Sequence, residues 1–162
     1  MGTGFHGGFG KTKGAIREIL RKRFSLPKRK KLFTRVQFQG TVVVNGKERD
    51  VSRRVYQRQD IDFNYRDPKS GKTNLEYMRE GRAPIGNDGK PIQLHHVVQK
   101  EVGPIVEIRA KTHRTYSRQL HRLIEPGSSF RRNDILRVQY NKFREAYWKW
   151  RAEEYEKGIS YE

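Results

Sequence analysis

Cysteine is absent from this 162-residue chain. Its absence excludes disulfide scaffolds, thiolate zinc fingers and cysteine nucleophiles, and it leaves histidine and carboxylate side chains as the strong metal ligands. Long apolar runs are missing too: no stretch approaches the roughly 18–20 consecutive apolar residues that span a bilayer, and no basic-then-apolar signal opens the chain. We therefore expect no membrane partner, and the five histidines are the first candidates for chemistry.

Acidic residues are few relative to basic ones. The chain has 18 Asp and Glu against 36 Lys and Arg, which gives a formal net charge of +18. Such a charge attracts a polyanion, and nucleases, ribosomal proteins and chromatin proteins share it. The composition therefore predicts a nucleic-acid partner without choosing between an enzyme and a binding protein.

Apolar residues make up only 33% of the chain, which favours one compact domain with extended ends. Five of the first ten residues are glycine, as is typical of a linker. We expect a linker over residues 1–14, a single domain over 15–158 and a tail over 159–162. A short helix is expected after the linker, ending before Pro27.

The pair Asn45-Gly46 is a strong signal for a β-hairpin. The alternating residues 33–39 and the β-branched run 41–44 lead into it, and residues 51–56 are expected as the return strand. Residues 60–89 are rich in Gly, Pro, Asn and Asp, which predicts turns and short pieces. Residues 92–99 are apolar around a histidine pair and resemble the end of a strand.

Two helices are expected after the histidine pair. The first covers residues 112–123, and the second covers residues 133–157 with Asn133 as its N-cap and Gly158 just past its end. Five residues of the longer helix recur at steps of four and three, which predicts one buried face: Leu136, Tyr140, Phe143, Tyr147 and Trp150.

The adjacent pair His95 and His96 is the most suggestive feature for chemistry. Because neighbouring side chains on a strand point to opposite faces, one imidazole can bind a metal while the other reaches a water. His113 and His121, eight residues apart, can share one face of a helix. Together the four can supply metal ligands and one general base near neutral pH. Each histidine taken singly is more often a surface or core residue, so spacing alone leaves both interpretations open.

Basic residues surround the two later histidines with no acid between them: Arg109, Lys111, Arg114, Arg118 and Arg122. Arginine binds phosphate in bidentate fashion, so we expect this cluster to contact a phosphate beside the histidines. A solvated basic helix face is the alternative.

The run over residues 81–99, GRAPIGNDGKPIQLHHVVQ, resembles the signature of the LHH group of the HNH/endonuclease VII nucleases, which are toxin modules of bacterial polymorphic toxins. The resemblance continues through residues 103–108, His113 and Leu120-His121. It thus covers about residues 60–123 and all four family histidines, and it leaves the hairpin and the long helix outside. The glycine-rich start around His6 resembles the junction before such toxin domains, which would put His6 outside the site.

The resemblance implies a treble-clef-like ββα-metal (His-Me finger) core at about residues 81–124. The residue patterns add an N-terminal hairpin and a long C-terminal helix to this core, so the expected fold class is α+β. The resemblance also implies one divalent ion, which is Mg, Mn, Zn or Ni. His95 would be a metal ligand, His96 the general base and His121 a second ligand. His113 would either complete the metal shell or hold the water or phosphate.

Gln99 and Glu107 are candidates for fixing an imidazole tautomer from behind. For Glu107, a plain solvent-exposed strand residue is the alternative.

The implied function is a metal-dependent endonuclease toxin, expected to cleave DNA without much sequence preference because it reads the backbone. An RNase of the same fold and a non-catalytic basic binding protein are the alternatives. As part of a larger secreted or delivered toxin it would act in the cytoplasm of a target bacterium, and an acidic immunity protein would neutralise it.

Overall fold

The computed structural model describes residues 31–98, 100–114 and 130–160. Every element described below belongs to one unit of the chain, Leu32–Glu162. Several predictions fall outside the described residues: the linker, the helix before Pro27, and the site residues Gln99, Arg118, His121 and Arg122.

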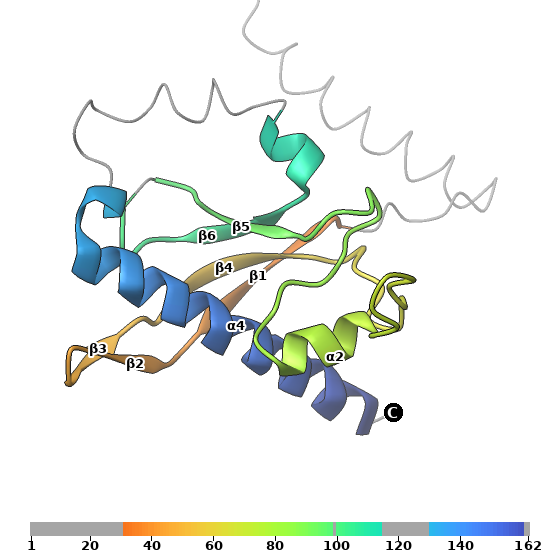
Figure 1. The fold of residues 1–162 in the computed structure, drawn as a ribbon, viewed down its shortest axis with the longest axis horizontal. Coiled ribbons are helices and arrows are strands. Elements are labelled where there is room, and N and C mark those ends of the chain that lie inside the picture. Colours follow the sequence, from red (N-terminus) through yellow and green to blue (C-terminus); the bar gives the residue numbers. More distant parts are fainter. Residues whose placement is uncertain (1–30, 99, 115–129, 161–162) are drawn as a thin grey trace, which may run out of the picture. The chain divides into compact units, whose positions relative to one another are not determined.

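A four-stranded sheet, in the order β1-β4-β6-β5, forms the centre of the fold (Figure 1). Its strands are β1 (Phe33–Phe38), β4 (Arg53–Arg58), β6 (Ile105–Ile108) and β5 (Gln93–His96). β1 is antiparallel to β4 and β5 is antiparallel to β6, whereas β4 and β6 are parallel. The predicted strand at the histidine pair is therefore confirmed, and it is an edge strand of this sheet.

The hairpin at Asn45-Gly46 is confirmed, but its return strand lies earlier in the chain than expected. β2 (Thr41–Val44) pairs with β3 (Lys47–Asp50), and Asn45 and Gly46 have φ of 52° and 74°, as the tight turn requires. Because two turn residues place Lys47 directly opposite Val44, pairing starts at Lys47 and not at residue 51. The predicted return segment 51–56 instead overlaps β4, which pairs with β1 in the four-stranded sheet.

Within the segment expected to hold only turns, the structure has a short helix, α2 (Asn74–Arg79). Thr73 Oγ1 accepts a hydrogen bond from the backbone N–H of Glu76 at 3.2 Å, and the Glu76 carboxylate accepts one from the N–H of Thr73 at 2.7 Å. This reciprocal capping box satisfies two N–H groups that a helix start leaves unpaired. The Thr-x-x-Glu spacing of Thr73 and Glu76 could have predicted the start of this helix from the sequence.

The long helix α4 (Asp134–Ser160) runs along the sheet and carries the predicted buried face (Figure 1). Asn133 is confirmed as the N-cap, because its Oδ1 accepts from the N–H of Leu136 at 3.2 Å. Phe143 and Tyr147 are completely buried, and the Phe38 ring of β1 packs edge-on against both. Gly158 does not end the helix as predicted, because α4 continues to Ser160. Glycine in a helix interior costs only roughly 1 kcal/mol, which does not stop α4 here. Among the described helices, none is long and apolar enough to cross a membrane.

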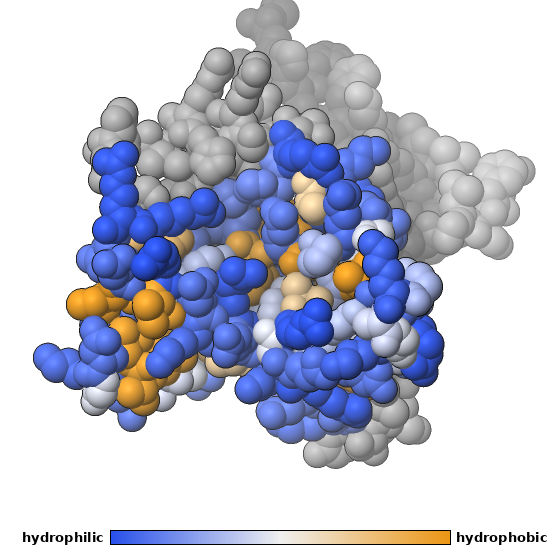
Figure 2. Space-filling view, viewed as in Figure 1, coloured by the Kyte–Doolittle hydropathy of each residue, from blue (hydrophilic) through white to orange (hydrophobic). Residues whose placement is uncertain are grey.

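Side chains on the face shown in Figure 2 are mostly hydrophilic, with a hydrophobic patch on the side of the hairpin and the start of α4. Three exposed aliphatic residues of these elements are Val43 (51% exposed), Ile135 (43%) and Val138 (37%). The buried apolar residues form one core cluster that includes sheet and α4 residues, and Leu94 of β5 belongs to it.

Candidate active site

A cavity of about 350 Å³ opens beside β5 and α4. Its lining comes from four elements: β5, the helical turn that starts at Ala110, the short 3-10 helix η1 (Phe130–Arg132) and α4. The described lining residues are Gln93, Leu94, His95, His113, Arg131, Tyr140 and Arg144. Two imidazoles and two guanidiniums thus share one cleft, which suits an anionic ligand.

His95 and His113 face each other in this cleft. Their ring centroids are 5.0 Å apart and the ring planes are inclined by 64°. β5 supplies His95, and the N–H of His113 bonds to the carbonyl of Arg109 at 3.0 Å in the first turn of the following helix. The sequence prediction that the strand pair and the later helix bring histidines together is met for these two residues.

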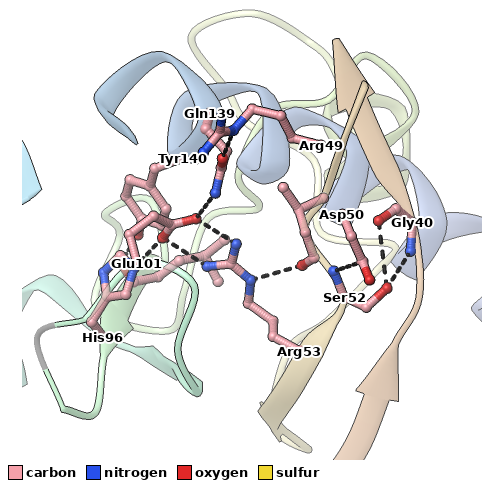
Figure 3. Close-up of polar contacts among 11 residues, drawn as sticks. Gly40, Arg49, Asp50, Ser52, Arg53, His96, Glu101, Gln139 and Tyr140 are labelled. Atoms are coloured by element: carbon pink, nitrogen blue, oxygen red, sulfur yellow. Dashed lines mark hydrogen bonds and ion pairs between the residues drawn. The ribbon is translucent and has the colours of Figure 1, made fainter. Parts of the chain in front are cut away.

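His96 lies on the opposite face of β5, as strand alternation requires. Its side chain is only 4% exposed, and its ring centroid is 4.5 Å from those of Phe130 and Tyr140. Nε2 of His96 is 2.6 Å from Oε2 of Glu101 (Figure 3). His96 is therefore held by a carboxylate and two aromatic rings beneath α4.

Glu101 is the centre of a buried polar network (Figure 3). Its side chain is fully buried and accepts two hydrogen bonds from the Arg53 guanidinium, at 2.9 and 2.6 Å. Gln139 of α4 donates a third at 3.0 Å, and Arg49 of β3 donates to the Gln139 side chain. The network thereby connects the hairpin, α4 and the loop after β5 to His96.

The charge state of Glu101 fixes the tautomer of His96. Burial acts to raise the pKa of this carboxyl, but the hydrogen bonds from His96 and Arg53 outweigh it and lower the pKa from 4.5 to about 2. The carboxylate is therefore ionised at neutral pH and can only accept hydrogen bonds. Nε2 of His96 therefore carries the hydrogen of this pair.

A family model, described as LHH, a nuclease of the HNH/ENDO VII superfamily with conserved LHH, matches residues 73–154. The chain belongs to this family. No solved structure matches it significantly. As a member of the LHH family, the protein is a nuclease, a hydrolase that binds and acts on nucleic acid.

The LHH match changes the limits of the family region. It begins at α2 and runs almost to the end of α4, so the long helix is part of what the LHH nucleases share and not an addition outside it. The family's Leu94 is 9% exposed, and its carbonyl accepts a hydrogen bond from Tyr140 of α4 at 2.5 Å. Burial raises the pKa of Tyr140 to about 12, so the hydroxyl stays protonated and α4 fixes the LHH strand directly.

Glu107 is not exposed, and it bonds to no imidazole within the part of the chain that the structure describes. It is fully buried and accepts hydrogen bonds from Arg151 at 2.5 and 3.0 Å, from the N–H of Arg58 at 2.8 Å and from the Tyr147 hydroxyl. The alternative of an exposed strand residue is wrong. In this LHH nuclease the carboxylate joins the sheet to α4.

Three members of the expected basic cluster lie in the described part of the chain: Arg109, Lys111 and Arg114. Arg109 donates to Asn87 at 3.0 Å, while Lys111 and Arg114 are exposed, and none of the three lines the histidine cleft. The cleft is lined instead by Arg131 of η1, just before α4, and by Arg144 of α4. Sequence reasoning missed both, because only the packing of α4 on the sheet brings residues of the C-terminal region to His95.

Two of the proposed metal ligands meet in the described structure. No group of three His, Cys, Asp or Glu side chains able to hold a metal occurs within residues 31–98, 100–114 and 130–160. The pair His95 and His113 nevertheless fits one ion: metal–nitrogen bonds of about 2.1 Å put two ligand imidazoles a few ångströms apart, as their 5.0 Å centroid separation allows. The third candidate, His121, lies outside the described residues.

Acid should weaken this fold through Glu101. Because the pKa of Glu101 is about 2 in the folded protein and near 4.5 when unfolded, its contribution to stability is present above pH 5 and is lost as the pH falls toward 2. We expect the Glu101→Gln variant to be about 3–5 kcal/mol less stable at pH 7, since it leaves Arg53 without its buried counter-charge. Its stability should also change less than that of the native protein between pH 5 and pH 2.

Urea denaturation across this pH range checks the expectation. Glu153→Gln, at an exposed position of α4, is the matched control and should follow the native protein. A Glu101→Gln variant with native stability at pH 7 would contradict the buried network.

Proposed function

We propose that this LHH nuclease is a metal-dependent endonuclease that hydrolyses phosphodiester bonds, with DNA as its main substrate. The observation that carries the proposal is the arrangement at the LHH strand: His95 faces His113 in a cleft with two arginines, while His96 is bonded to an ionised glutamate. His95 thus lines the cleft, and its neighbour His96 is oriented by Glu101 as a general base would be.

His95 and His121 would hold the divalent ion, and His113 would complete its shell or hold the attacked phosphate or the water. When bound, such an ion stabilises negative charge on the scissile phosphate and on the leaving oxygen. Mg, Mn, Zn and Ni are all compatible with imidazole ligands, at different affinities. Arg131 and Arg144 would orient the phosphate by charge-assisted hydrogen bonds.

His96 is the general base of this proposal. Nδ1 takes the proton of the attacking water, while the Nε2–H remains bonded to Glu101. The Glu101 carboxylate then stabilises the imidazolium that forms, as the buried aspartate does in a Ser-His-Asp triad. His96 is the last residue of β5 and the exposed Val97 follows it, so we place the water at this end of the strand.

We further propose that the nuclease is the toxin domain of a larger secreted or delivered protein and acts in the cytoplasm of a target bacterium. An acidic immunity protein would then bind it. The exposed residues Val43, Ile135 and Val138 on a chain of +18 charge suit such a partner, because protein interfaces combine an apolar centre with a polar rim. Co-expression tests this part: the product of the neighbouring gene should copurify and restore growth, and a product that does neither would contradict it.

A substrate comparison tests the enzymatic proposal. Supercoiled plasmid and total RNA are incubated with the protein and each of the four metals, and initial rates are compared. Faster cleavage of the plasmid supports a DNase, whereas faster cleavage of the RNA favours the alternative of an RNase. Salt-sensitive binding of both without cleavage would instead favour a non-catalytic binding protein.

A further inference from the structure

The histidine cleft shares one lining residue with a second cavity along α4. The second cavity, of about 400 Å³, lies against α4 and the segment after α2, and Arg144 lines both cavities. Asn141, which is also exposed on α4, and Arg82 line the second one. Arg144 therefore lies between the histidine cleft and the second cavity and lines both.

The segment that carries Arg82 is pressed against α4 by a glycine. Gly81 has a φ of +78°, and a Cβ at this position would meet the backbone oxygen and the Cβ of Glu145 at 3.2 Å. A larger residue is therefore excluded both by backbone conformation and by the close approach to the helix. This contact keeps Arg82 beside α4, next to the second cavity.

Arg82 presents its guanidinium to solvent. Its side chain is 60% exposed, its Cζ lies 4.5 Å from the centre of the Tyr77 ring, and the nearest carboxylate oxygen, of Glu80, is 3.6 Å away. Glu80 also pairs with Lys72, so its charge is shared between two cations. A third cavity, of about 430 Å³, shares Arg82 and contains the carboxylate of Asp67, which disfavours a further phosphate there.

We propose that the substrate strand runs from the His95–His113 cleft past Arg144 to Arg82, where it ends its contact with the enzyme. This inference rests on the proposed function and names the path of its substrate. Arg144 contacts the scissile phosphate from the wall that both cavities share, and Arg82 contacts a more distant phosphate of the same strand. The enzyme then binds several nucleotides of backbone on one side of the cleavage point, independently of base sequence.

Salt-dependent binding tests the path without requiring cleavage. The full chain carrying His96→Gln is titrated with fluorescein-labelled single-stranded oligonucleotides of 2 and 12 nucleotides. Adding Arg82→Gln should weaken binding of the longer probe several-fold and reduce the slope of log affinity against log salt by about 0.7, the value of one single-strand phosphate contact. The dinucleotide should show no such difference.

Arg79→Gln is the matched control, because Arg79 is 55% exposed on α2 and pairs with Glu156 away from the two cavities. It should leave the slope and the length dependence unchanged. Equal slopes for Arg82→Gln and Arg79→Gln would overturn the path, even if the native protein cleaves plasmid. A selective loss at Arg82 would support the path even if no cleavage is found, so the two proposals fail separately.

Discussion

Replacing His96 with glutamine will lower the rate of phosphodiester cleavage by about 100-fold to 10,000-fold, the usual contribution of a general base. The glutamine amide can still donate to Glu101, so the buried network keeps its hydrogen bond, but no group remains that takes up a proton. The measurement is the initial rate of plasmid cleavage at saturating metal. The low-pH limb of the native pH–rate profile, which reports the base, should disappear in the variant.

Two controls separate loss of the base from loss of the fold. His6→Ala removes a histidine that has no part in the proposed mechanism, and this variant should cleave at the native rate. Thermal unfolding of His96→Gln should remain cooperative, because the volume and one hydrogen bond at this buried position are retained. A folded His96→Gln variant that cleaves within threefold of the native rate would exclude His96 as the base.

Replacing His95 with alanine will weaken metal binding at least about 100-fold, since loss of a direct ligand exceeds the 10- to 100-fold cost of losing a residue that only orients one. His95 faces His113 across the cleft, and its removal leaves that pair with one imidazole. Isothermal titration of the purified protein with Zn, Ni or Mn measures the loss. Cleavage should fall in parallel, and higher metal concentrations should restore part of it.

His96→Gln is the matched comparison for this second experiment. Because its side chain points to Glu101 and not into the cleft, it should bind metal with native affinity while it fails to cleave. Substitution of His95 would then weaken metal binding, whereas substitution of the adjacent His96 would abolish cleavage without changing metal affinity. Native metal affinity in His95→Ala would contradict the role of His95 as a ligand.

Local signals in the sequence predicted much of the fold. Asn45-Gly46 fixed a tight hairpin because these residues adopt positive φ readily, and Asn133 started α4 because its side chain satisfies a free N–H. The aromatic face of α4 followed from its spacing. The helix α2 was missed because a six-residue element shows no periodicity, although its capping box was present in the sequence.

The candidate site was predictable only in part. His95 and His96 were found because they are adjacent and lie in a run that resembles a known family. The partner of His96 was not, since Glu101 gains its role through Arg53 and Gln139, which are 48 and 38 residues away in the chain. Contacts at such separations depend on the packing of α4 against the sheet, and no local pattern encodes them.

Chelation and rescue of plasmid cleavage test whether the protein is a metal-dependent nuclease. The native protein should nick and linearise supercoiled plasmid, stop when EDTA is added, and resume when a divalent metal is restored in excess, while His96→Gln stays inactive throughout. Plasmid that remains intact with every divalent metal, or cleavage that EDTA and the His96→Gln substitution both leave unchanged, would contradict a metal-dependent nuclease built on the LHH strand.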